Sequence, residues 1–133
     1  LEEMDAVTLF AQLIDESGFT LESEGYTVET RFCDESCLIL ANPQLLHRVF
    51  DNLVSNIRKY ARKTEPVVFE MLRDSGRFTV KVTNLVSEAP KSESSGIGLM
   101  SCSKILNSHS GSFTYENKDG RFITEITLPE KTK

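Results

Sequence analysis

The stretch NPQLLHRVFDNLVSNIRKYARK, residues 42–63, decides the fold of this chain. Asn42 followed by Pro43 predicts a helix start, because an Asn side chain caps free backbone amides and Pro is tolerated in the first helical turn. At about 100° per residue, the apolar side chains fall on one broad face, which comprises Leu46, Val49, Phe50, Leu53, Ile57, Tyr60 and Ala61. Such a face has to pack on a core.

A polar row borders this apolar face. The same helical spacing places four side chains in it, namely Asn52, Asn56, Lys59 and Lys63. Two amides one turn apart can converge on a single ligand. An amide oxygen suits Mg²⁺, and a Lys ammonium suits phosphate. An ordinary amphipathic helix with a solvated edge shows the same spacing, so the row by itself leaves both interpretations open.

A second motif, SGIGL, occupies residues 95–99. Gly96 and Gly98 flank Ile97 at the expected beginning of a helix, whose buried stripe comprises Leu99, Cys102, Ile105 and Leu106. Glycines directly before a helix expose backbone N–H groups at its positive end, where anions bind. A single Gly-x-Gly is weak support for such a site, because glycine turns begin many helices.

Taken together, the two motifs resemble those of the histidine-kinase catalytic domain, an ATP-binding domain of the GHKL or Bergerat type. The resemblance to its N box lies in Arg48, Val49, Asn52, Leu53, Asn56, Lys59 and Tyr60. Residues 95–99 stand where its G2 box is expected, and the resemblance extends over residues 5–129. It implies the Bergerat fold, with ATP and Mg²⁺ as cofactors.

The resemblance also implies roles for individual residues. Asn56 and Asn52 would hold Mg²⁺, and Asn56 and Lys59 would be the catalytic residues. Lys59 would reach the phosphates, Lys63 would add positive charge, and Tyr60 would line the nucleotide site. Asn84 would read the adenine. Backbone amides for the phosphates would come from Gly96, Ile97, Gly98 and Leu99.

The implied activity is that of an ATP-dependent protein histidine kinase. The γ-phosphoryl group would pass to a His on a separate dimerisation domain and from there to a response regulator. We expect residues 1–133 to be one cytoplasmic domain, a fragment that lacks the dimerisation and phosphoacceptor domain. The parent protein is expected to be a homodimer that can be anchored in the cell membrane, while this domain contacts neither membrane nor nucleic acid.

The chain departs from the family in its G1 box, Asp-x-Gly-x-Gly. Asn84 stands for the Asp, and Val86 and Glu88 replace the glycines. An amide oxygen still accepts a hydrogen bond from an amine, but it lacks the charge that strengthens the bond. Together with a short lid at residues 85–95, this departure predicts weaker nucleotide binding. The alternative function is a non-catalytic, pseudokinase-like signalling module with weak or no nucleotide binding.

Hydrophobic periodicity outlines the other elements. We expect a helix over residues 5–16 that runs on towards Glu24, strands at 26–32 and 38–40, and a hairpin of 67–72 with 78–83. Strands at 111–117 and 122–128 follow the last helix, and residues 130–133 are expected to fray. This order predicts a two-layer α/β sandwich, with three helices on one face of a mainly antiparallel sheet of five or more strands.

Composition bounds these interpretations. The 133 residues carry a net charge of −5 and are 39% hydrophobic, which suits one globular domain and, without a basic stripe, argues against nucleic-acid binding. The sequence contains no apolar run of about 18 residues. The spacing of Cys33, Cys37 and Cys102 favours reduced thiols over zinc ligands or a disulfide framework. His47 and His109 lack the context of a phosphoacceptor and are expected to be structural.

Overall fold

Five strands form the central sheet of the computed structural model, which describes residues 1–32, 36–86 and 93–131 and, for residues 93–98, the backbone alone. The strand order is β2-β4-β5-β7-β6. The strands are β2 (Val28–Arg31), β4 (Val67–Asp74), β5 (Arg77–Leu85), β6 (Ser112–Lys118) and β7 (Arg121–Pro129). Only the β2–β4 pair is parallel. The predicted, mainly antiparallel sheet is therefore confirmed.

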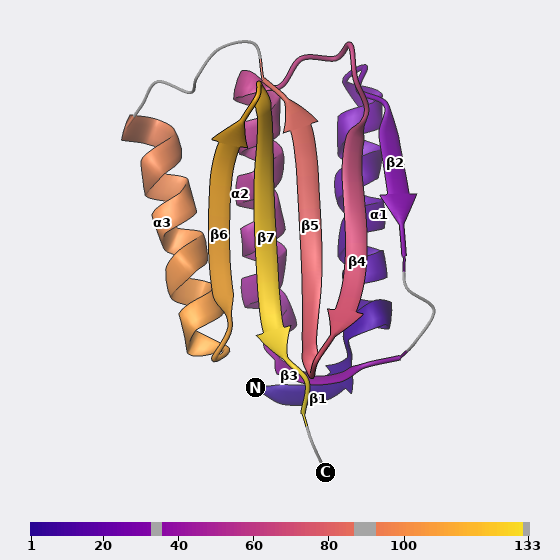
Figure 1. Cartoon of the computed structure of the whole chain (residues 1–133), viewed down its shortest axis with the longest axis vertical. Helices are drawn as coiled ribbons and strands as arrows, with labels where there is room; N and C mark the ends of the chain where they lie inside the picture. The colour runs from indigo at the N-terminus through magenta and orange to yellow at the C-terminus, as the bar shows by residue number, and fades with distance from the viewer. Residues whose placement is uncertain (33–35, 87–92, 132–133) are drawn as a thin grey trace.

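Three helices accompany the sheet: α1 (Ala6–Ser23), α2 (Pro43–Tyr60) and α3 (Glu93–Ser108). In Figure 1, α1 and α2 lie side by side behind the strands, and α3 runs along β6 at one edge. α3 contacts both α2 and β6. This arrangement is the predicted two-layer α/β sandwich.

The core lies between α1, α2 and the sheet. Alternate strand residues face the helices, so that Phe78, Val80 and Val82 of β5 are all buried. The ring of Phe10 on α1 lies 5.5 Å from that of Phe78 and 5.9 Å from that of Phe50 on α2. These three rings join the helices to the sheet, and burying aromatic side chains of this size dominates the stability of small cores.

A second, two-stranded sheet was missing from the prediction. β1 (Glu2–Asp5) pairs antiparallel with β3 (Leu38–Ala41) at the end of the molecule where the chain starts. The sequence EEMD has neither the alternation nor the β-branched residues of a strand. Its pairing depends on the apolar β3, which occupies this small sheet rather than the central one.

The expected frayed tail is wrong for residues 130–131. The amide of Glu130 donates to the Gly76 carbonyl at 2.8 Å, and that of Lys131 donates to the Leu38 carbonyl at 2.7 Å. Ion pairs of Glu130 with Arg73 and of Lys131 with Glu3 add to this attachment. The chain after β7 is thus fastened to the two-stranded sheet, while residues 132–133 lie outside the described part.

One predicted boundary is confirmed and another moved. α1 runs through Gly18 and ends at Ser23, as expected, with Gly25 just beyond it at φ 94°, a conformation that suits glycine. β5 continues past Asn84, which was expected to end it. Most of the expected lid, residues 87–92, lies outside the described residues. Within the described chain, no helix combines the length and the apolar character needed to cross a membrane.

Candidate functional site

Side-chain hydrogen bonds fix both ends of α2. At its start, Asn42 Oδ1 accepts from the amides of Gln44 and Leu45, each at 3.1 Å, as the predicted cap should. At its end, the Tyr26 hydroxyl donates to the carbonyls of Ile57 at 3.2 Å and Ala61 at 3.3 Å. The Asn42 cap satisfies amides that a helix leaves without intrahelical partners, and the Tyr26 contacts attach the last turn of α2 to the segment before β2.

One edge of α2 faces α3, and Asn52 lies on it. Its Nδ2 donates to Cys102 Sγ on α3 at 3.7 Å, and the thiol in turn lies 3.9 Å from the Val49 carbonyl. Burial raises the pKa of the Cys102 thiol, which keeps it protonated and able to donate to that carbonyl. This chain of contacts joins α2 to α3 and orients the Asn52 amide.

Asn56 lies one turn further along the same edge. Its side chain is buried, and its Oδ1 has no hydrogen-bond partner among the described residues. Leaving a buried acceptor unpaired costs about 1–3 kcal/mol. This amide oxygen is therefore available to a ligand that reaches it, and a hard cation such as Mg²⁺ suits it.

The rest of a metal site does not come from the usual charged ligands. Among the described residues, no group of three or more His, Cys, Asp or Glu side chains could hold a metal ion. Mg²⁺ commonly binds through one or two protein oxygens, retained waters and the phosphates of a substrate. The residues around Asn56 therefore fit Mg²⁺ carried by a nucleotide, not a metal bound by the protein alone.

The two lysines of the predicted polar row do not lie together on α2. Lys59 is exposed on the last turn of α2, and Tyr60, half-buried, ends the helix. Lys63 lies beyond the helix end, and its Nζ stands 5.2 Å from the centre of the Tyr26 ring, a cation–π distance. The helical placement of Lys63 beside Asn56 was wrong, because α2 stops at Tyr60.

Asn84 approaches the same end of α2 from the sheet. It is buried on β5 opposite Phe122 of β7, on the helix-facing side of the strand. The Arg62 amide donates to the Leu85 carbonyl at 2.8 Å, which fastens the end of β5 to the segment after α2. Asn84 and the last turns of α2 therefore belong to one corner of the domain.

The glycine motif lies in α3 rather than before it. The helix begins at Glu93, so Gly96, Ile97 and Gly98 fall within its first two turns. The free amides of a helix belong to its first four residues, here 93–96. The expected start at Gly96 was therefore three residues late. Leu99, Cys102, Ile105 and Leu106 are all buried, which confirms the predicted stripe.

Sequence reasoning missed the contacts of two residues. His109, buried just after α3, accepts the amide hydrogen of Asn42 on its Nε2 at 3.0 Å, which leaves Nδ1 to donate to the Ile105 carbonyl at 2.8 Å. It thus links the end of α3 to the cap of α2, a structural role of the expected kind. The sequence signal for Cys102 was only its place in the buried stripe, which did not reveal Asn52 as its neighbour.

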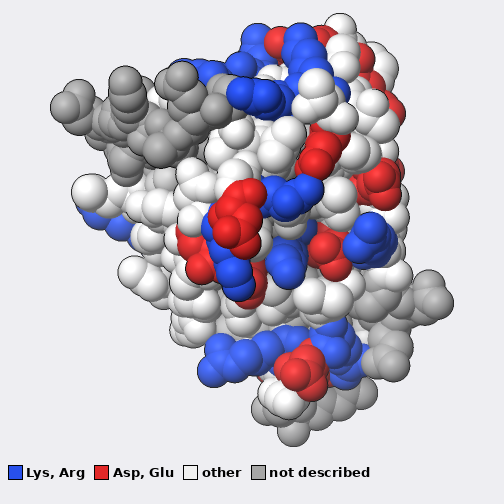
Figure 2. All heavy atoms as spheres, turned by 45° about the horizontal axis from the view of Figure 1, so that its top comes forward, with Lys and Arg blue, Asp and Glu red and all other residues white. Residues whose placement is uncertain are grey.

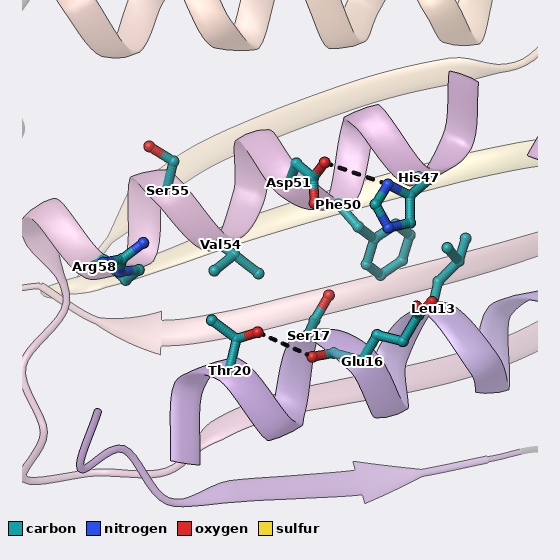
Figure 3. A pocket seen from close by; sticks show the side chains of 10 residues that line it. All are labelled: Leu13, Glu16, Ser17, Thr20, His47, Phe50, Asp51, Val54, Ser55 and Arg58. Carbon is teal, nitrogen blue, oxygen red and sulfur yellow. Dashed lines mark hydrogen bonds and ion pairs between the residues drawn. The ribbon is translucent and has the colours of Figure 1, made fainter. Parts of the chain in front are cut away.

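The opposite edge of α2 faces α1 across a hollow of about 410 Å³. Figure 3 shows Phe50 and Val54 pointing into it from α2, with Leu13 and Ser17 opposite on α1. Two ion pairs lie at its rim: His47 Nδ1 is 3.3 Å from Asp51 Oδ2, and Arg58 Nε is 2.8 Å from Glu24 Oε2. None of the predicted site residues whose side chains the structure describes lines this hollow.

The sequence of the chain is similar to a known protein family and to curated sensor proteins. Residues 41–132 match the family described as histidine kinase-, DNA gyrase B-, and HSP90-like ATPase. The probable sensor protein PcoS of Escherichia coli is 26% identical over 140 residues, which cover 90% of this chain and 28% of that protein. The sensor histidine kinase YrkQ of Bacillus subtilis is 28% identical over 123 residues, 92% of this chain and 28% of that protein. The chain thus spans under a third of the length of these curated relatives.

Solved structures share the fold. The nucleotide-free catalytic domain of histidine kinase ThkA superposes with a TM-score of 0.81 at 17% identity, over 99% of this chain and 98% of that one. The mycobacterial sensor histidine kinase MprB gives a TM-score of 0.77 at 17% identity, over 99% of each chain. At this level of identity the likeness establishes the architecture alone.

Proposed function

The chain belongs to the histidine kinase-, DNA gyrase B- and HSP90-like ATPase family, and on this basis we propose that it is the ATP-binding catalytic domain of a sensor histidine kinase. It binds Mg-ATP in the corner formed by α2, α3 and the end of β5. It presents the γ-phosphoryl group to a His on a separate dimerisation domain, for relay to a response regulator. The names of its curated relatives support the sensor-kinase assignment.

The observation that carries this proposal is the unpaired, buried Asn56 Oδ1. A protein retains such an atom at a cost in stability, and a cation ligand removes that cost. The chemistry that a Mg²⁺ held there would supply is positive charge, which would neutralise the charge developing on the phosphate during transfer. Asn56 would be its protein ligand, assisted by Asn52, whose amide is oriented through Cys102.

The surrounding residues would position the nucleotide. Lys59, exposed on the last turn of α2, would bring a positive charge to the phosphates. Several Lys and Arg side chains gather at the end of the domain where β5 finishes, whereas charges of both signs mix over the sheet face turned away from α1 and α2 (Figure 2). Tyr60 and Asn84 would line the base end of the site. Catalysis of this kind consists mostly of positioning and charge neutralisation.

The test is calorimetric titration with ATP in the presence of Mg²⁺ or of EDTA. We expect binding in the micromolar range with Mg²⁺ and at least about tenfold weaker binding in EDTA, because the metal joins Asn56 to the phosphates. AMP serves as the control ligand, since it lacks the β- and γ-phosphates that share the metal. A folded chain that binds no ATP at millimolar concentration would instead favour the non-catalytic signalling module.

Transfer to His is tested separately on the longer parent protein. Incubation with γ-labelled ATP is expected to place an acid-labile phosphate on a His outside the present residues, and a homodimeric parent would elute at twice its monomer mass. Absence of label from a parent that binds Mg-ATP would refute the kinase step while leaving nucleotide binding intact.

A further inference from the structure

The hydroxyl of Tyr26, in the turn between α1 and β2, reaches the end of α2. This residue is 6% exposed, and its hydroxyl oxygen lies 3.2 Å from the Ile57 carbonyl oxygen and 3.3 Å from that of Ala61. Burial raises the pKa of the Tyr26 hydroxyl, so the group stays protonated at neutral pH and donates to these acceptors. A side chain far away in the sequence therefore holds the last turn of α2.

The ring of Tyr26 has a partner of its own. Lys63 Nζ stands 5.2 Å from the ring centre, a cation–π distance. Gly25, directly before Tyr26, has a φ of 94°, and a Cβ placed there would come within 3.6 Å of the Lys63 side chain. The stem of Lys63 thus packs on the turn that carries the ring, and the segment after α2 is attached to this turn as well.

The end of β5 holds the same stretch of chain. The Arg62 amide donates to the Leu85 carbonyl at 2.8 Å, and Ala61 forms a bridge with Val86. Ala61 therefore takes part in two attachments, one to the α1–β2 turn and one to the sheet. Loss of the Tyr26 hydroxyl would break the first and leave the second, so the last turn of α2 would loosen without unfolding of the domain.

Asn56 is the residue directly before Ile57. Its side chain is buried, and its Oδ1 has no hydrogen-bond partner among the described residues. Mg²⁺ demands near-ideal octahedral geometry with oxygens at about 2.0–2.1 Å, so a small displacement of this turn would cost metal affinity. We propose that Tyr26 is a positioning residue, whose hydroxyl holds two carbonyls at the end of α2 and thereby places the Asn56 amide for the metal. This role rests on the Mg-ATP binding proposed above.

The experiment measures ATP affinity by calorimetry, with Mg²⁺ and with EDTA, for the wild-type chain and Tyr26→Phe. Phe keeps the ring and its contact with Lys63, so the hydroxyl alone is lost. We expect the variant to bind Mg-ATP about three- to tenfold more weakly, the range of one neutral hydrogen bond, and to bind ATP in EDTA within about twofold of the wild type. The advantage that Mg²⁺ gives would therefore shrink.

Asp5→Ala is the matched control. It also removes side-chain hydrogen bonds, but at the start of α1, at the opposite end of the domain from the last turn of α2 (Figure 1). Its affinities with Mg²⁺ and with EDTA should equal those of the wild type, because a chain that stays almost fully folded keeps its affinity when stability falls.

A second measurement needs no nucleotide. In the free chain, we expect the Ala61 and Arg62 amides to exchange their hydrogens at least about threefold faster in Tyr26→Phe than in the wild type, because the turn that carries them opens more often. NMR-detected hydrogen exchange measures these rates. The Leu46 amide, which donates to the Asn42 carbonyl at the start of α2, should exchange at an unchanged rate.

The outcomes separate the role of Tyr26 from the proposed function. Unchanged Mg-ATP affinity in a folded Tyr26→Phe variant, or equal weakening with Mg²⁺ and with EDTA, would overturn the positioning role and leave ATP binding standing. The same loss in Asp5→Ala, or unchanged exchange of the Ala61 and Arg62 amides, would also overturn it. A folded wild-type chain that binds no ATP at millimolar concentration would overturn both proposals.

Discussion

The two edges of α2 carry polar side chains of different kinds and satisfy them differently. On the edge that faces α1, His47 and Arg58 have acidic partners at the rim of an open hollow. On the edge that faces α3, Asn56 is buried and its Oδ1 has no partner within the described chain. The comparison teaches that unmet hydrogen-bonding capacity, more than the size of a depression, marks where a ligand is expected.

The largest expected effect, on nucleotide affinity, comes from removing the unpaired amide oxygen of Asn56. Asn56→Leu replaces the amide with an apolar group of similar volume, so Mg-dependent ATP binding should weaken about a hundredfold or more, as expected for loss of a metal ligand. The free energy of unfolding should stay level or rise, because an unpaired buried acceptor disappears. Calorimetry and urea denaturation measure the two quantities.

Asp51→Asn, on the opposite edge, is the matched control for this variant. It breaks the exposed contact with His47 and should leave ATP affinity unchanged. If Asp51→Asn weakened binding as much as Asn56→Leu, the distinction between the edges would fail.

A second variant tests how α3 is held against α2. His109→Ala removes the acceptor for the Asn42 amide and leaves a small cavity, so the free energy of unfolding should fall by about 2 kcal/mol. Urea denaturation measures the change. Exposed Ser110→Ala, at the neighbouring position, should change stability little. A loss below about 0.5 kcal/mol for His109→Ala would mean that this link contributes little to the α3-facing edge.

The third prediction concerns α1, the wall of the other edge. Asp5 caps this helix, accepting from the Thr8 hydroxyl at 2.7 Å and amide at 3.1 Å and from the Cys37 amide at 2.8 Å. Burial by itself raises the pKa of Asp5, but these hydrogen bonds outweigh it and hold the pKa below its usual range. The stability that ionised Asp5 contributes is therefore present above the unfolded pKa of about 4 and is lost as the pH falls through the folded value.

Asp5→Ala should accordingly lower the free energy of unfolding by about 1 kcal/mol at pH 7, and by progressively less as the pH falls below the unfolded pKa of about 4. Denaturation of both proteins across this pH range measures the difference. Asp5→Asn retains a capping oxygen without a titrating group and serves as the control. A difference between wild type and Asp5→Ala that grew on acidification would contradict this account of the cap.

The smallest effect belongs to the rim of the α1-facing hollow. Arg58→Met removes a solvent-exposed ion pair with Glu24 and keeps the apolar stem, so stability should change by only about 0.2–1 kcal/mol. Nucleotide affinity should not move, as titration would show. A large loss of ATP binding in this variant would make the hollow part of the nucleotide site.

Periodicity predicted much of this molecule because local rules and tertiary packing agree there. The apolar face of α2 is buried at Leu46, Val49 and Phe50, and its Asn42 cap forms as expected. The strand alternation of β5 and β7 likewise gave their buried sides. The roles assigned to Asn52, Asn56 and Asn84 remain predictions, although the structure brings α2 and the end of β5 together.

The failures share a cause, which is that distant segments set local boundaries. α2 ends where the Tyr26 hydroxyl meets its last carbonyls, so a helical wheel extended to Lys63 went too far. β1 forms because β3 offers it a partner, not because EEMD favours a strand. The neighbours of Cys102 depend on how α3 lies on α2. The spacing of residues within one segment predicts none of these contacts, because they depend on segments far away in the sequence.

The fastening of residues 130–131 to the β1–β3 sheet has a practical consequence. Leu1, next to β1, and Lys131, hydrogen-bonded to β3, both lie at the end of the sheet opposite to the one where β5 finishes (Figure 1). A dye, a bead or a surface tether attached near Leu1 or Lys131 would therefore be held at the end of the domain where the β1–β3 sheet lies. Such a handle would follow the swing of the whole domain in a single-molecule measurement without obstructing the corner where nucleotide is expected to enter.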